Sequence, residues 1–281
     1  MISGLDHVVA LIEDIEAGTK AYARLLGRKP SWRSASDGAQ TVLFSLDNMA
    51  LELMAPAGNS PTAERIREVI SLSGEGLASI CFRVGDIEKM HRKLDRVALK
   101  PDPVAEVESR DLDSGGILRW KRTRAATDLT RGVRMFFLEL GQERPRSAAN
   151  SLAPVLGLDH VVVSTEDCER ATALYGARLD LELALDRSHR DWGQLMFFRR
   201  GDLIVELVKR PVAGSDQAHD KLWGLSWRVA DIDAARARLI AAGIDVSEVR
   251  AGRKPGTRVM SVRDTTCGVH TLLLERTARE E

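Results

Sequence analysis

The sequence predicts an α+β fold made of four repeated modules, each with one helix and several short strands. Residues 5–9, Leu-Asp-His-Val-Val, recur at 158–162, and residues 82–87, Phe-Arg-Val-Gly-Asp-Ile, recur at 227–232 as Trp-Arg-Val-Ala-Asp-Ile. Two blocks in the same order at nearly the same offset indicate a duplication with small insertions. Helical patterns also alternate with β-branched and aromatic runs, which is typical of helices covering one face of antiparallel sheets.

A shorter repeat divides each half in two. Asp14-Ile15 aligns with Asp86-Ile87, and Asp167 aligns with Asp231 in the second half. Each of these aspartates follows a short apolar strand and precedes a helical pattern. Four βαβββ modules of about 60 to 70 residues result.

The helical and strand patterns follow the same order in both halves. In the last helical pattern, Asp231 is the expected N-cap and Gly243 the expected stop. The other elements are predicted from apolar periodicity and β-branched content. The predicted helices cover residues 15–26, 87–94, 171–179 and 232–242, and the clearest strands cover residues 41–44, 50–54, 194–198 and 203–208.

We expect two domains, residues 1–143 and 157–281, joined by a linker at 144–156. The linker region is rich in Ala, Ser, Arg and Pro, a composition typical of solvated connections. A charged segment at 106–131 enlarges the second module. It is interpreted either as an ordinary surface loop or as a lid.

Composition describes an ordinary globular protein. The 281 residues include 41 basic and 41 acidic side chains, and hydrophobic residues make up 44%. Balanced charge argues against a nucleic-acid-coating protein, so we expect a small-molecule partner and no nucleic acid. A charged ligand would have to be recognised by a local patch.

Cysteines and the N-terminus indicate a cytoplasmic protein without a membrane segment. Cys81, Cys168 and Cys267 are an odd number and lie far apart, which favours neither a disulfide framework nor a thiolate zinc site. The first residues lack a basic region followed by an apolar stretch, and acidic residues interrupt the chain before a membrane-spanning length accumulates.

Three motifs carry a family resemblance. They are residues 5–9 at the start of a module, residues 51–56, Leu-Glu-Leu-Met-Ala-Pro, at its last strand, and residues 82–87 at the start of the next module. Together they resemble the vicinal oxygen chelate superfamily, particularly its glyoxalase-like and methylmalonyl-CoA epimerase-like modules. The resemblance implies two tandem glyoxalase-like domains. In that superfamily two modules pair into a half-open barrel, and metal ligands project inward from the first and last strands of both.

The resemblance assigns some ligands of the first cleft and leaves others open. His7 and Glu52 match the family's positions on the opening and closing strands of the first module. The family's second histidine falls on Ser79, a poor ligand. The last ligand is Glu139 if the preceding turn absorbs three residues, and Phe136 if it does not, because strand facing alternates.

The second cleft repeats this pattern. His160 and Glu206 match, and the second histidine falls on Gly224. The closing ligand is Glu275 with the same gap, or Leu272 without it.

One histidine and two carboxylates can hold a divalent ion such as Mg²⁺, Mn²⁺, Fe²⁺, Ni²⁺ or Zn²⁺, with water or substrate oxygens completing the shell. Such an ion polarises a carbonyl and stabilises an enediolate. The resemblance then implies metal binding by His160, Glu206 and Glu275, with one glutamate, Glu206 or Glu275, also acting as the proton-transfer base. In the alternative interpretation, the histidines belong to the core and the glutamates are solvated at strand ends.

A basic loop precedes the last strands of the chain. Arg253, Lys254 and Arg258 lie among two glycines and a proline, a composition suited to a carboxylate, phosphate or coenzyme A ligand, or to a solvated hairpin. Trp192 and Trp223 near the module junction could line an apolar cleft. These features make the second half the expected working site.

Two classes of function fit these residues, with a third less favoured. The first is a metal-dependent lyase or isomerase of glyoxalase or epimerase type acting on an anionic carbonyl compound. The second is a non-catalytic binding protein of bleomycin-resistance type. An extradiol dioxygenase needs two histidines and a carboxylate, and neither cleft has the second histidine at the family's position. The sequence leaves the oligomeric state open, with a homodimer among the options.

Overall fold

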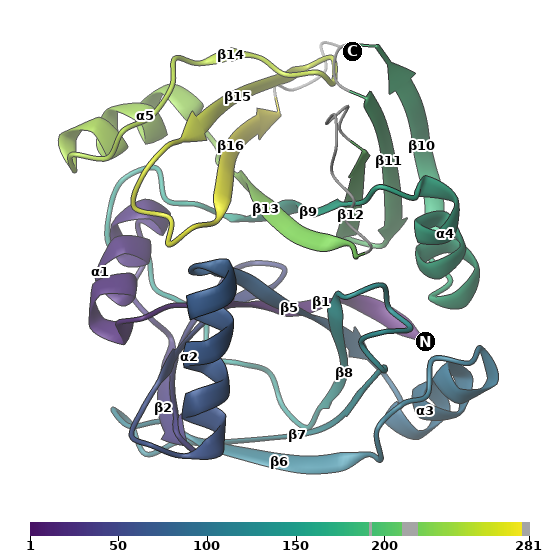
Figure 1. Ribbon diagram of the computed structural model, residues 1–281. Helices are drawn as coiled ribbons and strands as arrows, with labels where there is room; N and C mark the ends of the chain where they lie inside the picture. The colour runs from purple at the N-terminus through teal and green to yellow at the C-terminus, as the bar shows by residue number, and fades with distance from the viewer. Residues whose placement is uncertain (191–192, 210–218, 277–281) are drawn as a thin grey trace.

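The computed structural model describes residues 1–190, 193–209 and 219–276, and it shows two halves of the same construction (Figure 1). The first half contains β1 (Ile2–Leu11), α1 (Ile15–Leu26), β2 (Trp32–Ser36), β3 (Ala39–Ser45), β4 (Ala50–Pro56), α2 (Pro61–Ser73), β5 (Gly76–Val84), α3 (Ile87–Arg96), β6 (Ala105–Arg110), β7 (Ile117–Arg124) and β8 (Arg134–Leu140). The second half contains β9 (Gly157–Ser164), α4 (Cys168–Thr172), the π-helix η1 (Ala173–Arg178), β10 (Glu182–His189), β11 (Gly193–Arg200), β12 (Leu203–Lys209), β13 (Lys221–Arg228), α5 (Ile232–Ala241), β14 (Arg250–Ala251), β15 (Thr257–Val262) and β16 (His270–Arg276).

Each half forms one eight-stranded sheet in which the opening strands of its two modules lie side by side at the centre. The order is β2-β3-β4-β1-β5-β8-β7-β6 in the first sheet and β10-β11-β12-β9-β13-β16-β15-β14 in the second. The opening strands pair antiparallel, β1 with β5 and β9 with β13, and each also pairs in parallel with the last strand of its own module. The predicted α+β fold of four βαβββ modules is confirmed.

An aspartate starts the helix of every module. Asp14, Asp86, Asp167 and Asp231 each accept hydrogen bonds from backbone N–H groups of the first helical turn. Such caps satisfy donors that have no partner within the helix. The conserved position of the cap in all four modules fixes where each strand ends and its helix begins.

Two local predictions were wrong. Most of segment 106–131 is not a loop or lid but the hairpin of β6 and β7, whose exposed charged residues hid the strand pattern. The helix predicted at 171–179 is α4 followed by the wider π-helix η1. The segment expected to be a linker, 144–156, is largely exposed, and it is anchored at Ser147, which is buried and hydrogen bonded through its backbone to Ser45.

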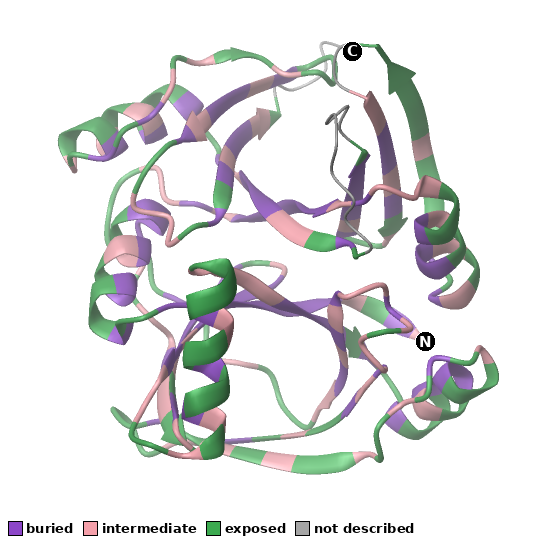
Figure 2. Cartoon of the chain, in the orientation of Figure 1, coloured by how far each residue is buried: buried purple, intermediate pink, exposed green. Residues whose placement is uncertain are grey.

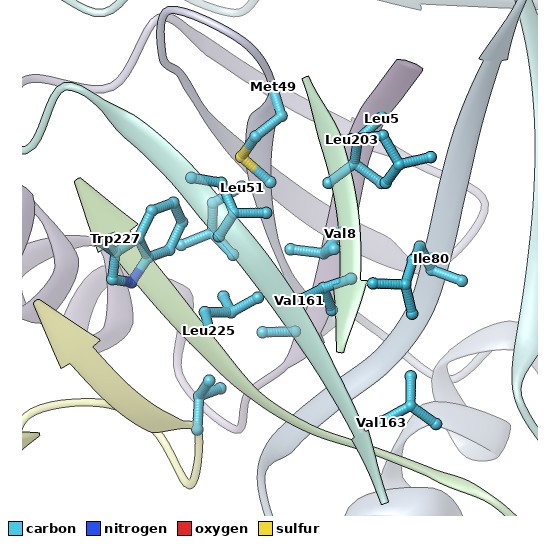
Figure 3. Packing of buried hydrophobic residues seen from close by; sticks show 14 of the residues in the cluster. Leu5, Val8, Met49, Leu51, Ile80, Val161, Val163, Leu203, Leu225 and Trp227 are labelled. Atoms are coloured by element: carbon cyan, nitrogen blue, oxygen red, sulfur yellow. The ribbon is translucent and has the colours of Figure 1, made fainter. Parts of the chain in front are cut away.

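The two sheets pack against each other and enclose one continuous apolar core. Figure 2 shows buried residues concentrated between the halves, and Figure 3 shows side chains from both sheets in contact. Burial of apolar side chains drives this packing. The core includes Leu5, Val8, Met49, Leu51 and Ile80 from the first half and Val161, Val163, Leu203, Leu225 and Trp227 from the second.

Two tyrosines at equivalent places in the repeat test this packing. Tyr22 in α1 and Tyr175 in η1 are both fully buried, but only the Tyr22 hydroxyl has a partner among the described residues, the backbone oxygen of Thr266 at 2.9 Å. Tyr22→Phe should therefore lower the free energy of unfolding by about 1 kcal/mol, and Tyr175→Phe by less than about 0.5. Urea denaturation measures both free energies of unfolding, and equal losses would contradict the conclusion that only the Tyr22 hydroxyl is hydrogen bonded to a described residue.

Candidate functional site

A β-bulge turns an aspartate and a histidine toward the same side of the opening strand in each half. Leu5 pairs with Phe82 and His7 with Cys81, so Asp6 is an extra residue between two adjacent pairs. Asp159 is the extra residue at the same place in β9. Neighbouring side chains of a regular strand point to opposite faces, whereas a bulge redirects one of them. This explains how Asp6 and His7 can touch.

The bulge builds the same buried polar chain in both halves. His7 lies 2.6 Å from Asp6 through Nδ1 and 3.1 Å from Glu52 through Nε2. His160 lies 2.9 Å from both Asp159 and Glu206 through the same two atoms. An arginine completes each chain, Arg144 at 2.6 Å from Asp6 and Arg276 at 2.5 Å from Asp159.

These contacts keep each histidine protonated. Burial would raise the pKa of Asp159, but hydrogen bonds from His160 and Arg276 lower it to about 2. Burial would lower the pKa of His160, but hydrogen bonds to Asp159 and Glu206 raise it to about 9. Burial would also lower the pKa of His7, but Cys81 and Asp6 raise it well above its ordinary value. Each cleft therefore holds an imidazolium between two carboxylates near neutral pH.

Glu139 and Glu275 do not join these chains. On β8, Met135 and Phe137 belong to the core between the halves while Phe136 and Leu138 pack on the His7 side, so Glu139 faces away from His7. Its carboxylate accepts a hydrogen bond of 2.7 Å from the backbone N–H of Ile87, at the start of α3.

Glu275 has the equivalent role in the second half. Its carboxylate accepts a hydrogen bond of 3.3 Å from the backbone N–H of Ile232, at the start of α5. The assignment of both glutamates as ligands was wrong, because the turns before β8 and β16 do not shift the register. Phe136 and Leu272 take the inward-facing positions.

The residues present do not fit the metal that the resemblance implied. At the family's ligand positions each cleft supplies one imidazole and one carboxylate, and the remaining positions carry Ser79 and Phe136 or Gly224 and Leu272. Across the described ranges no group of three or more His, Cys, Asp or Glu side chains is arranged to hold an ion. Protein sites for zinc and related metals use at least three such ligands.

The first cleft is filled by the protein itself. Ile66 and Ile70 of α2 pack with Val9, Leu11 and Cys81 on the inner face of the sheet. The Arg144 side chain, which holds Asp6, also lies over the ring of Trp120, 5.7 Å from its centre. These contacts leave the first cleft occupied by a helix and a guanidinium group.

The second cleft is lined by aromatic rings. Phe197 lies edge-on to His160, with ring centres 5.7 Å apart. Trp223 and Phe197 both pack against the cluster that contains Val162, and Trp223 stacks on His270 with ring centres 4.1 Å apart. The other tryptophan expected at the cleft, Trp192, lies outside the described residues.

His270 is a cleft residue that sequence reasoning missed. It pairs with Gly224 across β13 and β16, and a Cβ atom at position 224 would lie 2.6 Å from its backbone oxygen and 3.1 Å from its Cβ. The histidine expected at position 224 is therefore excluded by close packing, and His270 contributes an imidazole from the neighbouring strand. Its signal in the sequence was weak, since no motif surrounds it.

The basic loop divides between two environments. Arg258 forms ion pairs with Asp233 at 2.8 Å and Glu275 at 3.3 Å, on the helix-covered face of the sheet. Its predicted role in binding a cleft ligand was therefore wrong. Arg253 and Lys254 are exposed in the turn between β14 and β15.

Sequence comparison identifies the family. A sequence model described as a glyoxalase-like domain matches residues 5–179, and one described as the glyoxalase/bleomycin resistance protein/dioxygenase superfamily matches residues 159–260. The first match covers more than half of the chain, so the chain belongs to the glyoxalase-like domain family. This confirms the resemblance to the vicinal oxygen chelate superfamily. A search of curated protein sequences finds no significant match.

Solved structures share the whole architecture. A mutant of 4-hydroxymandelate synthase from Streptomyces coelicolor has a TM-score of 0.71 at 13% identity, covering 100% of this chain and 94% of that chain. The Mn(II)-bound glyoxalase from Novosphingobium aromaticivorans has a TM-score of 0.66 at 12% identity, covering 98% and 82%. The 2,3-dioxygenase LapB from Pseudomonas sp. KL28 has a TM-score of 0.63 at 14% identity, covering 98% and 92%. At these identities the likeness establishes the fold alone.

Among the residues that the structure describes, no helix has the length and apolar character needed to cross a membrane.

The protonated His160 predicts a pH-dependent contribution to stability. Its pKa is about 9 in the folded protein and about 6.5 in an unfolded chain, so its stabilisation is complete below about pH 6.5 and lost as the pH rises through about 9. The difference in unfolding free energy between the protein and its His160→Gln variant, measured by urea denaturation in EDTA, should shrink over this interval. A difference that stays constant or grows would contradict the imidazolium assignment.

Proposed function

We propose that the second cleft binds a small planar or aromatic organic molecule, and that the protein acts as a binding protein without a tightly bound metal. The observation that carries this proposal is the aromatic lining of the cleft. Trp223 stacks on His270, Phe197 lies edge-on to His160, and both Trp223 and Phe197 pack against Val162, Leu195 and Val208. Aromatic walls of this kind offer a large apolar contact area to a flat ligand.

The anionic part of the proposed ligand rests on the cations of the β14–β15 turn, because both ring N–H groups of His160 are already donated to Asp159 and Glu206. Arg253 and Lys254 add positive charge at the β14–β15 turn of the same sheet. We therefore include carboxylates and 2-oxo acids in the proposed ligand class.

The contrast between the clefts supports the choice of the second half. Ile66 and Ile70 cover the inner face beside His7, whereas the described residues beside His160 include the rings of Phe197 and Trp223. The paired histidine and glutamate are repeated in both halves, which is explained by their buried hydrogen-bonded chain without a catalytic role.

A metal-dependent lyase or isomerase is the second candidate, and one observation favours it. His160 Nε2 and Glu206 Oε2 meet at 2.9 Å at the base of the cleft, where both atoms could share a divalent ion with oxygens of a substrate. The Mn(II)-bound glyoxalase with the same fold is consistent with this candidate. A dioxygenase would additionally require His270 to join these two residues.

Metal content separates the two candidates. Freshly purified protein should contain well below one equivalent of Mn, Fe, Ni or Zn per chain by plasma mass spectrometry, because two protein ligands hold a metal weakly. One equivalent of metal that is lost in a Glu206→Gln variant would instead establish the enzyme candidate.

Ligand binding tests the cleft directly. Catechols, 2-oxo acids and acyl-CoA thioesters can be screened by thermal shift, since a ligand of the folded state raises the melting temperature. For any hit, Trp223→Ala should weaken binding by about tenfold or more, because a ring contact is lost. Trp120→Ala, which removes the ring beneath Arg144 in the first cleft, is the matched control and should leave the affinity unchanged. Equal effects of the two substitutions would reject the second cleft.

A further inference from the structure

A pocket lies at the junction between the halves, and its lining contains none of the residues of the two polar chains. Its volume is about 320 Å³, close to the lower limit for small-ligand sites. The loop before β8 supplies one wall and the segment from α4 to η1 supplies the other. It is lined by Asp128, Leu129, Arg131, Arg170, Ala173, Leu174, Arg178 and His219.

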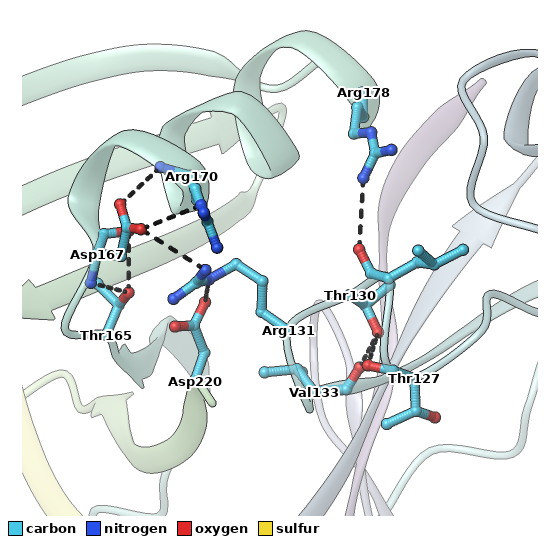
Figure 4. A network of polar contacts seen from close by, with 10 residues as sticks. Thr127, Thr130, Arg131, Val133, Thr165, Asp167, Arg170, Arg178 and Asp220 are labelled. Carbon is cyan, nitrogen blue, oxygen red and sulfur yellow. Dashed lines mark hydrogen bonds and ion pairs between the residues drawn. The ribbon is translucent and has the colours of Figure 1, made fainter. Parts of the chain in front are cut away.

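Arg131 crosses from the first half to the second and is held rigidly. Its Nε lies 2.9 Å from a carboxylate oxygen of Asp220, whose side chain is fully buried, and its backbone oxygen accepts a hydrogen bond from the Asp220 N–H (Figure 4). Arg131 has a φ of 58°, which is uncommon outside glycine. The next residue must be glycine, because a Cβ at Gly132 would lie 2.8 Å from the His219 side chain.

Two further guanidinium groups come from the second half. Arg170 has a side chain that is 79% exposed, with Nε 3.4 Å from Asp167. Arg178 makes long hydrogen bonds of 3.4 Å to the backbone oxygens of Leu129 and Ala98. In the described part of the chain Arg178 has no ion pair, so its charge is balanced only by carbonyl dipoles.

The helix that carries Arg178 has an unusual geometry. Residues 173–178 form a π-helix, a form that often occurs at functional sites. The hydroxyl of Tyr175 in this helix and Oδ1 of Asp220 are buried and have no hydrogen-bond partner among the described residues. Neither residue is among the pocket lining, and a carboxylate oxygen accepts hydrogen bonds, so these two atoms match a buried water beside the pocket and not the anion itself.

We propose that this junction pocket is a second ligand site. Its ligand is a small molecule in which an oxyanion, either a phosphate monoester or a carboxylate, is attached to a short apolar group. Arg131 from one half and Arg170 and Arg178 from the other surround the oxyanion. Leu129 and Leu174 contact the apolar part. Guanidinium groups match both oxyanions through paired hydrogen bonds. Because both halves contribute, the bound anion strengthens the contact between them.

Isothermal titration calorimetry with n-propyl phosphate, butyrate and 1-butanol at constant ionic strength tests the site. The proposed cleft ligands include carboxylates, so the titrations are repeated with the Trp223→Ala variant of the second cleft. Binding that persists in this variant and is lost in the pocket variants belongs to the junction pocket, so the two proposals can fail independently. At least one oxyanion should bind saturably, and 1-butanol should not bind. The oxyanion that binds with the higher affinity identifies phosphate or carboxylate as the group that the site recognises.

Substitution of the arginines locates the binding. Arg178→Gln should lower the affinity for the oxyanion by about tenfold or more, because a charge-assisted contact is lost. Arg199→Gln removes a cation of the same half that pairs with Glu182 far from this lining, and should leave the affinity unchanged. Arg170→Gln provides a second variant if Arg178→Gln does not fold. Absence of saturable binding by either oxyanion, or undiminished binding in these pocket variants, would overturn the proposal.

Discussion

The apolar contact between the two sheets is the constraint on which the remaining structure depends. Val8 and Val161 occupy equivalent places in β1 and β9, and both are fully buried in the core between the halves. Since side chains alternate along a strand, committing these residues to the shared core turns His7 and His160 to the opposite faces. The same contact brings the loop of Arg131 against η1, and the junction pocket lies between them.

The buried polar chains show how a duplicated site can be retained while its surroundings change. An uncompensated charge in the interior would be costly, so each imidazolium needs both carboxylates, and each inner aspartate needs its arginine. The chain is therefore preserved as a unit in both halves. The space in front of it is free to differ: α2 and Arg144 fill the first, whereas Phe197, Trp223 and His270 line the second.

The family resemblance describes the fold of the molecule, whereas the geometry of the side chains describes its site. Motifs around the opening strands specify a fold that also supports dioxygenases and a Mn(II)-bound glyoxalase. The ligands of this chain depart from the pattern at the second module of each half. A common architecture therefore coexists with a different site, as expected when function depends on a few side chains placed on a shared scaffold.

The sequence by itself determined the duplication, the order of the modules and the Asp231 cap, and it assigned His7 and Glu52 to one cleft and His160 and Glu206 to the other. These follow from local patterns and from the motifs they resemble. Only the tertiary structure decided that Glu139 and Glu275 cap helices, that His270 stands over Gly224, and that Arg131 reaches Asp220 in the other half. The physical reason is that strand facing reverses with each residue of register, and register is set by turns and by packing between segments far apart in the chain. Local composition carries no record of those distant contacts.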